Sequence, residues 1–388
     1  MSSWLGQRLQ ELRERSLYRQ LRRIESAQGA TVQLNGRQVI NFSSNDYLGF
    51  ANHPDLRSAA QASIEKWGVG SGASRLICGT QAPHAQLEEK LAEWKRTESA
   101  LSFGSGYAAA VGIIPALLGK GDVAIADKLC HASLLDGIKL SEATLRVFPH
   151  NNLEKLESHL EWARQTHPQA RILILTESVF SMDGDLAPLR EIVGLKNRFG
   201  AQLLLDEAHA IGVIGPEGRG LAAAEKLDDQ VDVQMGTLSK ALGVSGGYIC
   251  GSRELIEWLI NRSRSFIFST APPPSLAETA TAAVQMLRSK AGKERQERLA
   301  RNLGLMRREL AEDDSHQSAI FRWMMGEAKD ALDAAEELLE KGFLVPAIRY
   351  PTVGKGKARL RVTVTASHEE AQIRSLGQTL RAVAQRRN

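Results

Sequence analysis

The 388-residue sequence has few cysteines and no apolar run long enough to cross a membrane. Cys78, Cys130 and Cys250 lie far apart without paired spacing, which indicates neither a disulfide framework nor a zinc site. The most apolar stretch, 108–118, contains Pro115 and stops well short of a membrane span. The first helical pattern is charged and lacks the apolar centre of a signal peptide. We expect a globular protein of the reducing cytoplasm without a membrane partner.

The sequence also has almost no excess of positive over negative charge. There are 49 basic and 45 acidic residues, a formal net charge of +4, so no nucleic-acid partner is indicated. The string Asp206-Glu207-Ala208-His209 is helicase-like. However, the sequence has no Gly-x-x-x-x-Gly-Lys-Ser/Thr element to hold a triphosphate. With 43% hydrophobic residues, the chain can bury a large core and is long enough for two domains, or for one large and one small domain.

Short apolar strands alternate with helical stretches from about residue 90 to 250. This alternation predicts an α/β fold with a doubly wound, mostly parallel sheet. The predicted strands are 100–103, 123–126, 171–177, 202–206, 231–234 and 247–250.

The two ends of the chain have other patterns. An amphipathic helix and a hairpin turning at Asn35-Gly36 come first. After the prolines at 272–274, we predict one long helical segment over 275–313 and then a small α+β unit. The expected parts are an N-terminal arm over 1–45, a large cofactor-binding domain over 46–280 and a small C-terminal domain over 281–388.

An acid at a strand end and a lysine among small residues predict a ligand site. The run Leu203-Leu204-Leu205-Asp206 is typical of a buried parallel strand, and open α/β sheets bind ligands at the carboxyl ends of such strands. Lys240 lies in a segment rich in Thr, Ser, Ala and Gly, where a lysine can lose its proton and act as nucleophile and base. An aldehyde cofactor needs such an amine, which indicates pyridoxal phosphate chemistry.

Nearby polar residues fit the same chemistry. Asp206 and His209 are three apart, so both can face one ligand if the chain turns helically. Asp206 could keep a pyridine nitrogen protonated, and His209 could reach a phenolic oxygen. His131 could stack on a flat ring, although a lone histidine there is more often structural. Arg361 could clamp a carboxylate or simply lie on a solvated strand face.

The segment 104–109, Gly-Ser-Gly-Tyr-Ala-Ala, follows a predicted strand and opens a helix. With Asp127 about 20 residues further on, it matches a dinucleotide-binding fingerprint. The same turn would serve a single phosphate, because helix-opening amides converge on an anion, or it could be a packing turn. Hydroxyls at Thr237 and Ser269-Thr270 suit phosphate, though each alone is more often structural. A dehydrogenase and a pyridoxal phosphate enzyme both stay open on these features.

Four motifs carry a family resemblance. They are Asn41–Gly49 (NFSSNDYLG), His131-Ala132-Ser133, Asp206–His209 (DEAH) and Gly243–Gly247 (GVSGG). With them the chain resembles, nearly end to end, the α-oxoamine synthases. The resemblance implies a fold type I, aminotransferase-like α/β protein, with a large domain built on a mostly parallel doubly wound sheet and a small α+β C-terminal domain. It also implies pyridoxal 5'-phosphate as the cofactor and a homodimer.

The resemblance further implies roles for individual residues. Lys240 would bind the cofactor aldehyde, Asp206 the pyridine nitrogen and His209 the phenolic oxygen, while His131 would stack over the ring. The other implied cofactor contacts are Gly106, Tyr107, Ser181, Thr237 and, reaching the phosphate of a second subunit, Ser269 and Thr270. The implied substrate contacts are Arg22, Asn45, His131, Thr352 and Arg361. Two features depart from the family pattern: Tyr107 replaces a common phenylalanine, and 320–327 replaces a more apolar, proline-containing strand.

The implied reaction is the decarboxylative condensation of an amino acid with an acyl thioester. The motifs favour L-alanine and a pimeloyl thioester, on coenzyme A or acyl carrier protein, in biotin biosynthesis. Glycine C-acetyltransferase, 5-aminolevulinate synthase and serine palmitoyltransferase share the chemistry and stay open as alternatives. A nicotinamide-dependent dehydrogenase would leave Lys240, His209 and Asp206 without a joint role. A catalytically silent module that binds acyl thioesters is a third alternative, and no metal is expected.

Overall fold

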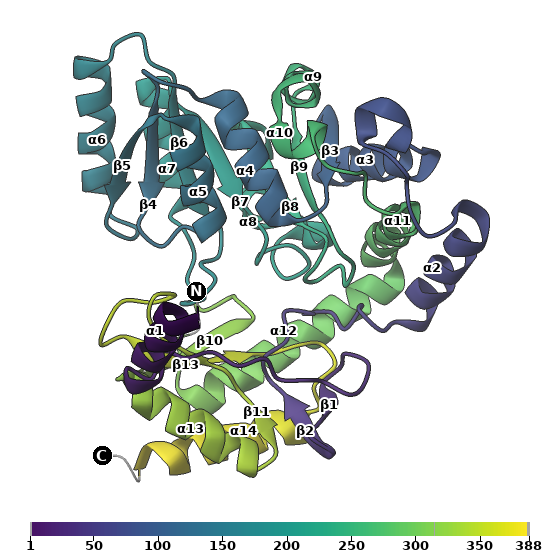
Figure 1. Ribbon diagram of the computed structural model, residues 1–388, viewed down its shortest axis with the longest axis vertical. Helices are drawn as coiled ribbons and strands as arrows, with labels where there is room; N and C mark the ends of the chain where they lie inside the picture. The colour runs from purple at the N-terminus through teal and green to yellow at the C-terminus, as the bar shows by residue number, and fades with distance from the viewer. Residues whose placement is uncertain (1, 314, 386–388) are drawn as a thin grey trace. The chain divides into compact units, whose positions relative to one another are not determined.

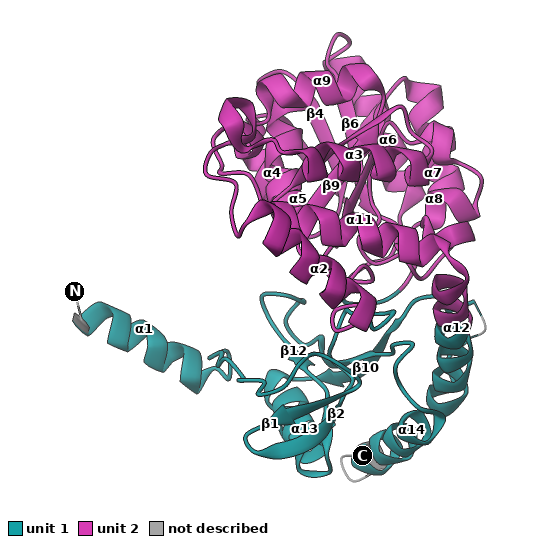
Figure 2. Cartoon of the chain, turned by 90° about the vertical axis from the view of Figure 1, so that its right-hand side faces the viewer, with its two compact units in different colours: residues 1–49, 182–184, 298–388 teal, residues 50–181, 185–297 magenta. Residues whose placement is uncertain are grey.

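The computed structural model describes residues 2–313 and 315–385. The chain folds into two compact units, a small one of residues 1–49, 182–184 and 298–388 and a large one of residues 50–181 and 185–297 (Figure 2). Compactness alone does not define a functional domain, so the domain boundaries expected at 45 and 280 stay a prediction. Within the described ranges, no helix has both the length and the apolar composition needed to cross a membrane.

The large unit is built on a seven-stranded sheet in the order β3-β9-β8-β7-β6-β4-β5 (Figure 1). The strands are β3 Ser99–Phe103, β4 Val123–Asp127, β5 Thr144–Phe148, β6 Ile172–Glu177, β7 Gln202–Asp206, β8 Val233–Thr237 and β9 Gly247–Gly251. The run from β5 to β8 is parallel, whereas β9 is antiparallel to both β3 and β8. The predicted mostly parallel α/β sheet is confirmed.

Helices cover both faces of this sheet. The helices wholly within the large unit are α2 Pro54–Trp67, α3 Ala82–Lys95, α4 Gly106–Leu117, α5 Ala132–Ser141, α6 Leu153–Thr166, α7 Leu189–Phe199, α8 Leu221–Ala224, α9 Arg253–Arg262, α10 Arg264–Ile267 and α11 Pro274–Arg288. Along β4, Ala124 and Ala126 join the core formed with α4 and α5, while Val123 and Ile125 lie outside that cluster. All four are fully buried. Because side chains alternate along a strand, β4 must be covered on both faces, as a central parallel strand requires.

Two strand predictions need correction. β5 was not predicted, because it is an edge strand whose polar, partly exposed residues give little apolar signal. β8 was predicted at 231–234 but extends from Val233 to Thr237, since Met235 pairs with Asp206 and Thr237 with Gly247. Pairing with two neighbours therefore sets the end of β8, which no local pattern could indicate.

The small unit contains two three-stranded sheets, β1-β2-β11 and β10-β13-β12. Its strands are β1 Thr31–Leu34, β2 Arg37–Asn41, β10 Ile320–Gly326, β11 Phe343–Leu344, β12 Ala347–Ile348 and β13 Ala358–Thr363. Its helices are α1 Ser2–Glu14, α13 Ala328–Glu340, α14 Glu370–Gln385 and, from Arg298 onward, α12 Lys290–Leu310. The predicted hairpin is confirmed: Asn35 and Gly36 have φ of 51° and 71°, as a tight hairpin turn requires.

The single long helix predicted over 275–313 is wrong. α11 ends at Arg288, and α12 runs over Lys290–Leu310. Ser289 between them is extended, with φ −82° and ψ 174°, and its Oγ donates to the Met286 carbonyl at 2.7 Å. A serine hydroxyl competes with the helix for backbone hydrogen bonds, which accounts for the break.

Candidate active site

Lys240 and His209 meet in the large unit, with Lys240 Nζ 2.7 Å from His209 Nε2. His209 follows β7 and is buried, and Lys240 lies in the turn after β8. The turn is tightly packed: Gly243 has φ +68°, and a Cβ there would lie 2.4 Å from the Ala51 nitrogen. The lysine is therefore held against the imidazole by a turn that needs glycine.

Asp206 ends β7 and is buried at the same end of the sheet. Its Oδ1 accepts the Ala208 N–H at 2.9 Å, which fixes the direction of the carboxylate. The charges of Asp206 and Lys240 both act on His131: burial lowers the pKa of His131, Lys240 lowers it further and Asp206 opposes the change. These three predicted residues therefore lie close enough to interact electrostatically.

His131 is held at the start of α5. Its Nδ1 accepts the backbone N–H of Ser133 and lies 2.8 Å from Ser133 Oγ, so the imidazole is the N-terminal cap of the helix. The lowered pKa favours the neutral ring. A neutral, oriented imidazole is suited to packing against a flat heterocycle.

Glu177 was missed by the sequence analysis. It ends β6, pairs in register with Asp206 and is buried. Burial and then Asp206 raise the pKa of the Glu177 carboxyl to about 8, while Lys240 and backbone hydrogen bonds from His131 and Ser181 act in the opposite direction. Its Oε1 has no hydrogen-bond partner within the described chain. The sequence does mark Glu177, because it ends an apolar strand in the same way as Asp206.

An anion site is available at the start of α4. Ser105 caps this helix by accepting the Ala108 N–H at 3.0 Å. A Cβ at Gly104 would meet nothing within 4 Å, and one at Gly106 would meet only Thr237, at 3.7 Å. The helix therefore opens onto free space beside the Thr237 hydroxyl, which donates to the Gly246 carbonyl at 2.9 Å. A phosphate fits such a place, because helix-opening amides point toward it.

The other predicted cofactor contacts have different surroundings. Tyr107 is 49% exposed, and its hydroxyl donates to Asp136 at 2.8 Å, a contact that raises the pKa of Tyr107. Ser181 is buried in the loop after β6. Ser269 and Thr270 lie on an exposed segment after α10. Their roles stay predictions.

Asn45 and Arg361 lie together in the small unit. Arg361 Nη1 donates to Asn45 Oδ1 at 3.1 Å and to Thr363 Oγ1 at 2.9 Å. The Tyr47 ring is buried beside them, and burial raises its pKa to about 12 in spite of Arg361. Arg361 is therefore a buried, oriented guanidinium and not part of a solvated strand face.

Arg22 and Thr352, also in the small unit, are exposed. Arg22 Nη2 lies 3.5 Å from Glu336, and Thr352 Oγ1 accepts a hydrogen bond from Arg19 at 3.1 Å. Neither interaction involves Asn45 or Arg361, so the substrate roles of Arg22 and Thr352 stay predictions.

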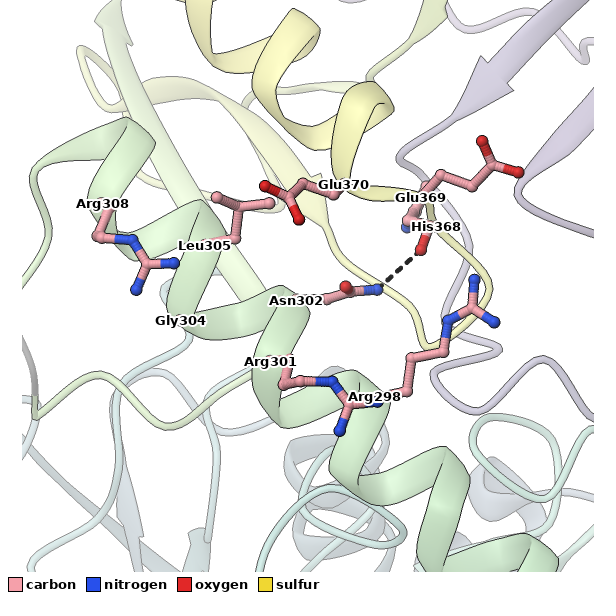
Figure 3. A pocket seen from close by; sticks show the side chains of 9 residues that line it. All are labelled: Arg298, Arg301, Asn302, Gly304, Leu305, Arg308, His368, Glu369 and Glu370. Carbon is pink, nitrogen blue, oxygen red and sulfur yellow. Dashed lines mark hydrogen bonds between the residues drawn. The ribbon is translucent and has the colours of Figure 1, made fainter.

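A separate groove of about 720 Å³ lies in the small unit along α12 (Figure 3). Asn302 crosses it to donate to the carbonyl of His368 at 3.0 Å, and Arg298, Arg301 and Arg308 lie along the same helix. None of the predicted site residues is among its lining residues. No group of three or more His, Cys, Asp or Glu side chains among residues 2–313 and 315–385 is placed to hold a metal ion.

The large-unit residues fit pyridoxal phosphate on structural grounds. The Lys240 amine beside an imidazole can bind an aldehyde, and the buried acid at the end of β7 can bind a pyridine nitrogen. The start of α4, with open space before it, can bind a phosphate. The model of the aminotransferase class I and II family matches residues 37–380. The match confirms the predicted fold type I, aminotransferase-like architecture.

Sequence relatives narrow the class. An 8-amino-7-oxononanoate synthase of Geobacter sulfurreducens is 48% identical over 377 residues, which cover 96% of both chains. One of Thermoanaerobacter pseudethanolicus is 43% identical, over 95% of this chain and 94% of the relative. The chain therefore belongs to the class I and II aminotransferase family and, within it, to the family of the 8-amino-7-oxononanoate synthases. The predicted pyridoxal phosphate-dependent acyltransferase class is confirmed.

Solved structures agree on the fold. A serine palmitoyltransferase of S. paucimobilis with a bound PLP-myriocin aldimine has a TM-score of 0.92 and 31% identity, over 99% of this chain and 97% of that one. An 8-amino-7-oxononanoate synthase of Francisella tularensis has a TM-score of 0.77 and 27% identity, over 90% and 98%. The TM-score is higher for the palmitoyltransferase, at 0.92 against 0.77, whereas the two synthase sequences are 48% and 43% identical to this chain and the palmitoyltransferase is 31% identical. We give the sequence identity more weight, because members of this fold with different substrates share their architecture.

Proposed function

We propose that this enzyme condenses L-alanine with a pimeloyl thioester, releasing carbon dioxide and the thiol, to form 8-amino-7-oxononanoate for biotin. The observation that carries the proposal is the contact of Lys240 Nζ with His209 Nε2 beside Asp206, in a chain 48% identical to a synthase of that name. Pyridoxal phosphate, when bound, supplies an aldehyde for the amine and a ring that accepts the electron pair of the substrate carbon.

The residues of the large unit would move and hold protons. Lys240 Nζ would take the α-proton of alanine, and His209 at 2.7 Å would orient the amine. Asp206 would hold a proton on the ring nitrogen. His131, neutral because its pKa is lowered, would pack on the ring and hold it in place. Glu177, with its raised pKa, would add little negative charge beside Asp206 at neutral pH.

The residues of the small unit would recognise the substrates. Arg361 is oriented by Asn45 and Thr363, so its planar guanidinium is preorganised to bind a carboxylate such as that of alanine. Arg22 and Thr352, both exposed, would contact the longer acyl substrate.

A second copy of the chain would complete the assembly. Val69, Ile77 and Phe268 are 78%, 79% and 72% exposed, which is unusual for large apolar side chains. A bridge between Ser74 and Thr270 places their segments side by side. A homodimer formed through this patch would carry Ser269 and Thr270 toward the cofactor phosphate of the other copy. We infer a cytoplasmic location, where alanine and activated acyl groups are available.

Thiol release by purified protein with pyridoxal phosphate tests the proposal. We expect release with L-alanine plus pimeloyl-coenzyme A, but not with glycine plus acetyl-coenzyme A or serine plus palmitoyl-coenzyme A. Lys240→Ala should abolish it, while Lys139→Ala, on the exposed face of α5, should not. Thiol release only with the glycine pair or only with the serine pair would assign the enzyme to the acetyltransferase or the palmitoyltransferase. Full activity of Lys240→Ala would overturn the mechanism. Pimeloyl-acyl carrier protein should be tried as a second donor.

A further inference from the structure

His150, in the loop between β5 and α6, lies between two carboxylates. Its Nδ1 is 3.1 Å from Asp127 Oδ1, and its Nε2 is 2.5 Å from Asp185 Oδ2. The Phe180 ring packs edge to face on the imidazole, with centroids 4.3 Å apart and an interplanar angle of 85°. Since both ring nitrogens face a carboxylate oxygen, the geometry favours a ring with a proton on each nitrogen.

The charged form of this imidazole is favoured at neutral pH. Burial acts to lower the pKa of His150, but the hydrogen bonds and charges of Asp127 and Asp185 outweigh it and raise the pKa to about 9. Asp127 faces the ring from the end of β4, Asp185 faces it from the loop after β6, and the uncharged Phe180 packs on it.

Each carboxylate also holds a loop that leads to a predicted cofactor contact. Asp127 is fully buried, and its Oδ1 accepts the N–H of Leu129 at 2.7 Å, two residues before His131. Asp127 Oδ2 accepts the N–H of Asn151 at 2.8 Å, which ties the His150 loop to the same acid.

The second loop is closed by its own backbone. The Asp185 carbonyl accepts the N–H of Phe180 at 3.0 Å, and Val179 and Leu186 form a bridge. Ser181 lies inside this closed segment. His150 therefore joins the loop presenting His131 to the loop presenting Ser181, and the neighbouring Asn151 adds a bond from its Nδ2 to the Leu186 carbonyl at 3.0 Å.

We propose that His150 is a positioning residue, whose imidazole clamps Asp127 to Asp185 and thereby sets the spacing of His131 and Ser181 around pyridoxal phosphate. The proposal rests on the cofactor site described above. His150 touches neither cofactor nor substrate in this role, so it acts on cofactor affinity through the two loops. Deprotonation should release one carboxylate and loosen the loops.

Equilibrium titration of cofactor-free protein with pyridoxal phosphate, followed by the absorbance of the bound cofactor, tests the clamp. We expect His150→Gln to weaken binding about tenfold near neutral pH, as the loss of charge-assisted hydrogen bonds predicts. In the unmodified protein, affinity should fall as pH rises through about 9, where His150 loses its proton. That step should be missing in His150→Gln, and Asp185→Asn should move it to lower pH by about one unit.

His159→Gln is the matched control, because His159 lies on the neighbouring α6 and its Nε2 meets the Val147 carbonyl, at 3.3 Å, rather than a carboxylate. It should leave both affinity and pH step unchanged. Carbon-13 histidine NMR, measured on the holoenzyme, gives the His150 pKa directly, even if a variant folds poorly. An ordinary His150 pKa, or wild-type affinity of His150→Gln over the whole pH range, would refute the clamp. If the unmodified protein does not bind pyridoxal phosphate at all, the cofactor site itself is refuted.

Discussion

At the scale of single residues, two acids end neighbouring parallel strands. Glu177 and Asp206 are paired in register on β6 and β7, and both are buried. Two adjacent buried carboxyls cannot both ionise cheaply, so one of them keeps its proton. The raised pKa of Glu177, about 8, makes this carboxyl the one that keeps its proton at neutral pH.

This assignment predicts a pH-dependent stability. The unfolded Glu177 carboxyl loses its proton near pH 4.5, whereas the folded one keeps it to about pH 8. Stability from this group is present below pH 4.5 and is lost as pH rises through that window, by about 1.4 kcal/mol per pH unit. Glu177→Gln, which cannot ionise, should escape this loss. Its free energy of unfolding relative to the unmodified protein should therefore rise from about pH 5 to about pH 8.

Urea denaturation of cofactor-free protein at both pH values measures the difference. Glu161→Gln, on the exposed side of α6, provides the comparison, because its side chain is solvated in both folded and unfolded states. If the free energy of unfolding of Glu177→Gln differs from that of the unmodified protein by the same amount at both pH values, the Glu177 carboxyl is ionised in the folded protein.

Whether a site residue could be predicted from the sequence depends on whether its role is marked by the residues next to it in the chain. Asp206, Lys240 and His131 stand out because local sequence marks a strand end or a glycine-rich turn. The family pattern adds Asn45 and Arg361, whose contact links positions far apart in the chain. His150 has no local signal, because its role depends on the carboxylates of Asp127 and Asp185, which tertiary folding brings to it.

At the scale of elements, the same distinction separates correct from wrong predictions. β7 matches its predicted range of 202–206, since a fully apolar run ending in an acid marks both ends. β5 carries a mixed, partly exposed sequence and forms only because β4 offers a parallel edge. The break at Ser289 also escaped the pattern, because the charged residues on both sides continue a helical spacing. The prediction therefore missed what strand pairing defines, namely β5 and the end of β8, and also a local break inside a continuous helical pattern.

A buried ion pair joins α3 to the end of β7. Lys95 Nζ lies 2.5 Å from Glu207 Oε2, and both side chains are 1% exposed. Glu207 Oε1 accepts the Ala222 N–H at 3.1 Å, so the carboxylate also anchors the start of α8. In the string that includes Asp206 and His209, Glu207 is thus a packing acid without a helicase-like role.

We expect Lys95→Met to destabilise the fold by about 3–5 kcal/mol, because it leaves a buried carboxylate without its counter-charge. Lys90→Met on the same helix removes a pair with Glu93 whose side chains are 40% and 48% exposed. It should cost no more than about 1 kcal/mol. Urea unfolding of both variants at neutral pH makes the comparison, and equal losses would show that the Lys95 pair is solvated.

At the scale of the whole molecule, several large apolar side chains on neighbouring segments are exposed to solvent. Val69, Leu76, Ile77 and Phe268 lie on segments joined by the Ser74–Thr270 bridge and by the bond from the Ala271 N–H to the Ala73 carbonyl, at 2.9 Å. Large apolar surface of this kind favours burial in an interface. Ser269 and Thr270 lie on the same segment as Phe268, so covering these side chains with a second copy would also bring the two proposed phosphate contacts to the interface.

We therefore predict that Ile77→Glu, which adds a charge to these exposed apolar residues, prevents the proposed dimer from forming and weakens pyridoxal phosphate binding. Light scattering after size exclusion measures the mass, and cofactor titration measures the affinity. Leu140→Glu, at a 64% exposed position on α5, is the matched control and should stay dimeric with unchanged affinity. If the unmodified protein is a monomer that binds cofactor fully, the patch is no dimer interface. If Ile77→Glu becomes monomeric yet keeps its affinity, the interface stands but Ser269 and Thr270 have no role in the neighbouring site.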